Sequence, residues 1–208
     1  MTKFRSFRSA LLVFSICVAA YCSALRGLAH GQYYFPNREL RISDLPTLTA
    51  KSKDPSDVLV AAVQIIFHDA EVCCSKNSAL EDDVQRPDPK SLKDIAAKLQ
   101  GRHLLSDSRP IMVTADYVPA DQVNPGQIVG ALREKRLPLI EWDSRMYVLY
   151  GAIFDETSDP ETGTVDAIHK LFLLDVRFSD ARREITFNRD TDDWGKVQGL
   201  LMLKAAPQ

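Results

Sequence analysis

The chain is poor in the residues that mark several special classes of protein. Its 208 residues include nine glycines and eleven prolines, too few for a collagen-like chain or one dominated by flexible linkers. Four cysteines are too few for a fold held together by disulfides. Basic residues are not in excess, since 26 Lys and Arg face 28 Asp and Glu, which argues against nucleic-acid binding. The remaining composition, 45% hydrophobic and 26% charged, is that of an ordinary globular chain.

The first 31 residues have the organisation of an export signal. Three basic residues precede an uncharged stretch, residues 9–25, whose centre is strongly apolar. This pattern is typical of a secretory signal peptide, and small residues place the expected cleavage after Ala29 or Gly31. The same stretch, followed by Arg26, also fits an uncleaved anchor in the inner membrane. We therefore expect an exported chain, periplasmic or extracellular, that contacts a membrane only if this segment is uncleaved.

Residues 32–208 are then the mature chain, which we expect to form a single domain. Removing residues 1–31 leaves 22 basic and 28 acidic side chains, a net charge of −6. Such a charge suits neither DNA nor an anionic membrane surface. We expect a peptide or protein as the partner, and no nucleic acid. Only two cysteines remain, the neighbours Cys73 and Cys74.

The first half of the mature chain is predicted to be mainly helical. Residues 32–53 have no clear period and are expected to form an extended lead-in. Asp54 and Pro55 are typical of a helix start, and residues 58–67 are apolar except for Gln64, which predicts a buried central helix.

Two shorter helices and a strand are predicted next. Apolar residues recur at helical spacing within residues 92–99, and either Asp88, which precedes Pro89, or Ser91 is expected to cap this helix. Asn124 caps a further helix that stops before Pro138, and residues 111–117 are a short strand candidate.

The rest of the chain predicts strands. They cover residues 137–142, 146–154, 167–176, 184–188 and 197–203. No helix long enough for a crossover joins them, so we expect an antiparallel meander of about five strands. Helices first and an antiparallel sheet second predict an α+β fold.

The order of these elements resembles papain-like cysteine peptidases of the bacteriocin-processing type, which act on double-glycine leaders. The strings LPLIEW (137–142), MYVLYGAIFDE (146–156) and HKLFLLDVRF (169–178) carry the resemblance, together with the helices before them. It covers residues 45–204 and implies a papain-like fold, in which a buried central helix packs on the sheet. In that family a Cys at the start of the first helix is the nucleophile, a His on one strand is the base, and an Asp ending the next strand orients the His.

Most of these signature positions are replaced in this chain. The resemblance places the following residues at the former catalytic cleft: Ser56, Asp57, Arg145, Met146, Tyr147 and Asp175. The helix start has no Cys, Met146 stands at the His position, and no Gln is present for the oxyanion hole; only the Asp, Asp175, is kept. An attacking thiolate needs both a base and an oxyanion donor. The resemblance therefore implies a catalytically degenerate domain that acts as a binding or structural module.

An active peptidase is the alternative. Cys73 or Cys74 would be the nucleophile and His169 the base. Asp175 cannot orient that base, because six residues on one strand separate the two side chains by about 20 Å. The cysteines also fit a vicinal disulfide, buried thiols or an intermolecular bridge.

Two further features have alternative interpretations. The spacing of His68 with the two cysteines matches no common zinc pattern, so we expect no metal, and nothing indicates a cofactor. Charged residues also gather around the predicted strand ends: Arg145, Asp175, Arg177, Asp180, Arg182 and Arg183. They fit either a polar cleft that holds a peptide or an anionic group, or a network of surface ion pairs.

Overall fold

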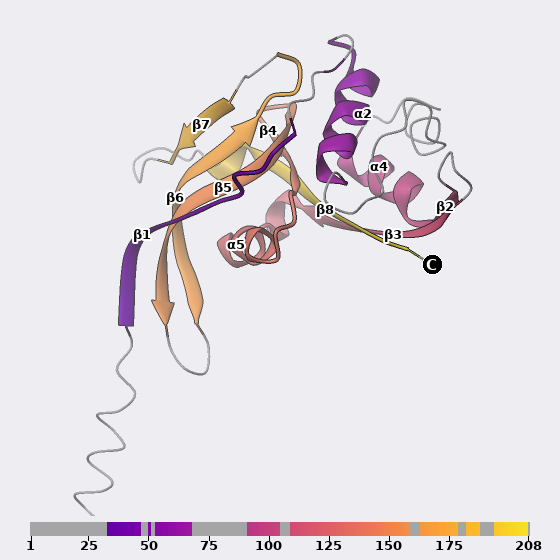
Figure 1. Ribbon diagram of the computed structural model, residues 1–208. Coiled ribbons are helices and arrows are strands. Elements are labelled where there is room, and N and C mark those ends of the chain that lie inside the picture. Colours follow the sequence, from indigo (N-terminus) through magenta and orange to yellow (C-terminus); the bar gives the residue numbers. More distant parts are fainter. Residues whose placement is uncertain are drawn as a thin grey trace, which may run out of the picture.

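The computed structural model describes residues 33–46, 50, 53–67, 91–104, 109–158, 163–178, 182–187 and 194–207. Within these ranges the chain has an α+β fold with three α-helices and one antiparallel sheet of eight strands (Figure 1). The helices are α2 (Pro55–Ile66), α4 (Leu92–Leu99) and α5 (Pro125–Arg133). The strands are β1 (Tyr33–Arg41), β2 (Gly101–Leu104), β3 (Pro110–Pro119), β4 (Leu139–Trp142), β5 (Arg145–Ser158), β6 (Thr164–Leu174), β7 (Arg182–Thr186) and β8 (Val197–Pro207). The predicted export signal lies outside the described residues.

The helix predicted after Asp54 is present as α2. Asp54 is the N-cap residue with an extended backbone, and Pro55 occupies the first turn, where its missing N–H has no helical partner to lose. Residues 58–63 are all buried, and Gln64 is among the few partly exposed positions. An apolar helix buried on nearly every side is stabilised by packing rather than by helix propensity.

The two shorter helices begin at predicted caps, α4 at Ser91, one of its two expected caps, and α5 at Asn124. The Ser91 hydroxyl accepts a hydrogen bond from the Asp94 N–H at the start of α4. At the start of α5, Asn124 and Gln127 form a reciprocal capping box. Both helices place their apolar residues on the face that is buried.

The predicted antiparallel meander is confirmed for β4 to β7, but the number of strands and the position of the last strand are wrong. The strands follow the order β2–β3–β8–β4–β5–β6–β7, so β8 returns to the middle of the sheet rather than pairing with β7. Neighbouring residues of β8 explain this position: Leu200 is buried against the α5 side and Leu201 against the α2 side. A strand with apolar side chains on both faces can bury both faces only when it lies in the interior of the sheet.

The number rises to eight because β1, β2 and β3 also belong to the sheet, so the expected order of helices first and sheet second is wrong as well. The expected extended lead-in, residues 32–53, contains β1, which runs antiparallel along the second half of β5 (Figure 1). Almost all of its side chains are exposed, and only Leu40 is partly buried. A strand without a buried face shows no alternating hydrophobic pattern, which is why the sequence did not predict it.

The sheet has a hydrophobic core on each face. Helices α2 and α4 cover one core, and α5 covers the other. The long strand β5 serves both, since Val148 and Tyr150 belong to the first core while Tyr147 and Leu149 belong to the second. Its first residues pair with β4, and its later residues pair with β1. The start of β5 lies near α4, because both line the same pocket.

Candidate binding site

A pocket of about 220 Å³ lies where the β4–β5 hairpin faces α2 and α4. Two of the predicted cleft residues, Arg145 and Met146, line it from β5. Val58 lines it from the first turn of α2, directly after Asp57. The structure therefore brings residues 145–146 and the start of the first helix to one pocket.

The β4–β5 turn fixes the direction in which Arg145 leaves the sheet. Trp142 pairs with Arg145, so Asp143 and Ser144 alone form the turn. Both have positive φ, of 51° and 58°, which is the conformation of a two-residue hairpin turn that matches the twist of the strands. Arg145 itself is exposed, and no hydrogen bond or ion pair joins its side chain to another described residue.

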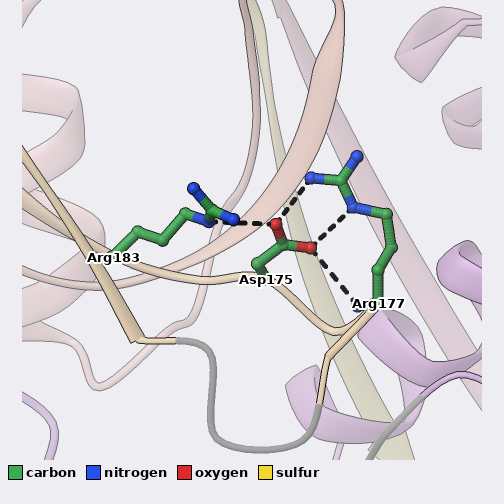
Figure 2. Close-up of polar contacts among 3 residues, drawn as sticks. All are labelled: Asp175, Arg177 and Arg183. Carbon is green, nitrogen blue, oxygen red and sulfur yellow. Dashed lines mark hydrogen bonds and ion pairs between the residues drawn. The ribbon is translucent and has the colours of Figure 1, made fainter.

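Asp175 is the centre of an ion network beside this pocket. Its side chain is fully buried and contacts two arginines (Figure 2). Arg177 donates from Nε to Oδ1 and from Nη2 to Oδ2, both at 2.6 Å, and its backbone N–H also faces Oδ1. Arg183 donates from Nε to Oδ2 at 3.1 Å. Asp175 thus binds cations of the β6–β7 region rather than a histidine.

The arginines keep this buried carboxyl ionised. Burial alone raises the pKa of Asp175, but the hydrogen bonds from Arg177 and the charges of Arg177 and Arg183 outweigh it, and the pKa is lowered. The hydrogen bond to Asp175 in turn raises the pKa of Arg177. Arg177 lines the pocket, so the ionised Asp175 holds a permanent cation at its wall.

The pocket has more cations than acids. Lys53 is distant from Arg145 and Arg177 in the sequence but lines the same pocket. Its Nζ lies 5.0 Å from the centre of the Phe178 ring. Glu141 is the one acid among the described lining residues. Burial raises the pKa of Glu141, and no ion pair joins it to a described cation. Sequence reasoning missed Lys53 and Glu141; the acid within the apolar string LPLIEW was the available signal.

Tyr147, another predicted cleft residue, faces away from this pocket. Because side chains alternate along β5, it lines a second pocket of about 430 Å³ with Arg145 and Arg183. The ring of Tyr147 also lies 5.7 Å from Cζ of Arg177. The arginines that share Asp175 therefore border different pockets.

His169 is bound to a carboxylate that the sequence did not single out as its partner. Its Nε2 lies 2.8 Å from Oδ1 of Asp155 on the neighbouring strand. A β-bulge at His169 interrupts the β5–β6 register at this point. Asp155 also accepts hydrogen bonds from the Tyr34 hydroxyl and from the Asn37 N–H, both of β1.

This cluster is arranged around an ionised Asp155. Its side chain is almost completely buried, and burial alone raises its pKa. The hydrogen bonds from Tyr34, Asn37 and His169 outweigh that effect and lower the pKa to about 2. The next residue, Glu156, is also buried and is paired with Arg38 of β1 and Arg133 of α5. Two buried carboxylates thus attach the exposed strand β1 to the sheet.

The structure describes only some of the predicted site residues. Cys73, Cys74 and His68 lie outside the described residues, and of Ser56 only the helical backbone is described. Among the described residues, no group of three or more His, Cys, Asp or Glu side chains could hold a metal ion. None of the helices in the described ranges has the length and apolar character needed to cross a membrane.

Comparison with known proteins found no matching family model, no matching curated protein and no matching solved structure.

Proposed function

We propose that this chain is an exported binding module on a papain-like scaffold that is catalytically degenerate, and that the pocket beside the β4–β5 hairpin binds a peptide. The observation that carries the proposal is which residues stand where the resemblance implies the catalytic base and the acid that orients it. Met146 has no proton to exchange, and Asp175 is occupied by two arginines. Without a base beside the first helix, a nucleophile placed there would not be activated.

The composition of the pocket supports ligand binding at the same place. It combines apolar walls from Val58, Leu92 and Met146 with charged groups from several elements. Recognition sites commonly have this character, an apolar surface with a few fixed polar groups. The unpaired Arg145 at its rim is not needed to hold the fold together, since no described residue is bonded to it.

Peptide selection on the purified protein tests this function. Peptides selected from a random phage library are synthesised and their affinities measured by calorimetry for the wild-type protein, Arg145→Glu and Arg102→Glu. Arg102 is the matched control, an exposed arginine on β2 at the edge of the sheet. We expect Arg145→Glu to weaken binding about ten-fold or more and Arg102→Glu to leave it unchanged. Failure to select any peptide, equal binding by both variants, or cleavage of the bound peptide would each refute the proposal.

The arrangement of His169 favours one alternative function, a cysteine peptidase that uses Cys73 or Cys74. A carboxylate bound to one ring nitrogen holds an imidazole in the orientation that a general base requires, and Asp155 binds His169 in this way. Iodoacetamide labelling of the reduced, folded protein distinguishes the two functions. Fast labelling of a single cysteine at pH 6 that slows in His169→Ala would establish the peptidase pair; slow labelling unaffected by His169→Ala would exclude it.

A further inference from the structure

We infer that the pocket beside the β4–β5 hairpin recognises a carboxylate group of its peptide ligand, with Arg177 as the binding side chain and Asp175 as the residue that positions it. The inference rests on the proposed function, because it names the chemical group that the same pocket would take. It starts from charge: Lys53, Arg145 and Arg177 line the pocket against one acid, Glu141. Neither Lys53 nor Arg145 is ion-paired within the described part of the chain.

Arg177 has donors to spare after it binds Asp175. A guanidinium carries five N–H donors in a fixed plane. Asp175 takes one from Nε and one from Nη2 (Figure 2). Even if the neighbouring Tyr147 hydroxyl accepts one more, two N–H groups remain. Two such groups are what a carboxylate needs for paired hydrogen bonds.

The buried Asp175 also fixes where those donors point. A free arginine loses side-chain entropy when it is held in one orientation, which weakens its interactions with a ligand. Here both oxygens of a fully buried carboxylate already hold the guanidinium, and the side chain of Arg177 is 19% exposed. The arginine is therefore oriented before the ligand arrives.

Glu141 favours a carboxylate over a more highly charged anion. It lines the pocket without an ion-pair partner in the described residues, and burial raises its pKa. A second carboxylate beside it can be accommodated by uptake of one proton, whereas a doubly charged phosphate would add a larger repulsion. When the ionised Asp175 that binds Arg177 is counted with Glu141, the three cations exceed the acids by one charge, which matches a ligand group of single negative charge.

The test uses three small peptides that differ only in carboxylates. They are the amide of N-acetyl-Ala-Gln-Ala, the same peptide as the free acid, and the amide of N-acetyl-Ala-Glu-Ala. Binding is followed by NMR through the Met146 methyl group and the Arg177 Nε–H signal, both inside or beside the pocket. We expect at least one acidic peptide to bind roughly ten-fold more tightly than the neutral amide. The free acid identifies a C-terminal carboxylate as the source, and the Glu peptide identifies an acidic side chain.

The outcomes separate this inference from the proposed function. If all three peptides shift the Met146 signal with equal affinity, the pocket binds peptides and the carboxylate inference is wrong. If none of them shifts it at millimolar concentration, both are wrong.

Variants then test the individual roles. Arg177→Lys keeps the charge but removes the paired donors, and we expect it to lose the preference for acidic peptides. Lys53→Gln, at an exposed position, removes one of the three pocket cations and tests the contribution of charge even if Arg177→Lys does not fold; Arg102→Gln is the matched control. Asp175→Asn should shift the Arg177 Nε–H signal before any ligand is added and weaken acid binding, whereas Arg183→Gln should leave that signal in place. An unchanged preference in both Arg177→Lys and Lys53→Gln would overturn the inference.

Discussion

Replacing Asp175 by Asn is the most direct test of the ion network at the site. The substitution keeps the shape of the side chain and removes its charge. Asp175 is fully buried, and both of its oxygens accept hydrogen bonds from arginines. Removing one partner from a buried ion pair typically costs about 3–5 kcal/mol, because the remaining charge is left unpaired.

The exposure of the two arginines places the expected loss at the lower end of this range. The side chain of Arg183 is 47% exposed and that of Arg177 is 19% exposed, so both regain some contact with water. We therefore expect Asp175→Asn to lower the free energy of unfolding by about 3 kcal/mol at pH 7. Arg183→Gln removes only a half-exposed partner and should cost about 1 kcal/mol or less.

The loss should also depend on pH. The folded state lowers the pKa of Asp175 below its value in the unfolded chain, which is about 3.9. The stabilisation is therefore complete above that unfolded value and disappears as the pH falls through the folded value. Because Asn does not titrate, the difference between wild type and Asp175→Asn should shrink as the pH falls from 5 toward 3.

Urea unfolding at several pH values measures these differences directly. Asp116→Asn is the matched control, since Asp116 is exposed on β3. A loss below 1 kcal/mol at pH 7, or a loss that stays constant from pH 6 to pH 3, would refute the account of Asp175 as an ionised, buried anchor.

Three further outcomes are expected. Gly151→Ala should lower the free energy of unfolding by about 1–3 kcal/mol in urea titrations, because its Cβ would lie 2.7 Å from the Leu40 carbonyl oxygen; wild-type stability would contradict this packing. Asp155→Asn should speed amide hydrogen exchange in β1 more than in the rest of the sheet, and uniform exchange would exclude the attachment of β1 through Asp155. The substitution should also lower the free energy of unfolding by about 2 kcal/mol at pH 7. Because the pKa of Asp155 is lowered to about 2, this loss of stability should disappear as the pH falls from 4 toward 2. Glu141→Gln should strengthen binding of an acidic peptide severalfold in calorimetry, and the gain should grow as the pH rises through the raised pKa of Glu141; weaker binding would assign Glu141 a different role.

Local signals predicted the helices and the central strands of this fold. Asp54 before Pro55, Ser91 and Asn124 mark helix starts that depend only on neighbouring residues. The apolar run in β5 likewise indicated a buried strand before any pairing was known.

The pairing of distant segments could not be predicted in the same way. Strand β1 is attached by polar contacts to Asp155 and Glu156, more than a hundred residues further along the chain, and it lacks a buried face. The position of β8 between β3 and β4 also depends on contacts across the whole fold. At the site, the resemblance indicated Arg145 and Met146, but the approach of Lys53 to the same pocket has no local sequence signal.

The contrast between the whole chain and its pocket narrows the kind of ligand that can bind. The chain carries a net charge of −2, whereas the described lining of the pocket has three cations and one acid. Charges beyond about one Debye length, roughly 8–10 Å at physiological salt, are largely screened, so the pocket cations act mainly on a group that enters the pocket. A polyanion would extend past this range and meet the net negative chain, while a peptide with one carboxylate would not. For the proposed peptide ligand, the electrostatics therefore favour a single acidic group on an otherwise neutral or basic chain.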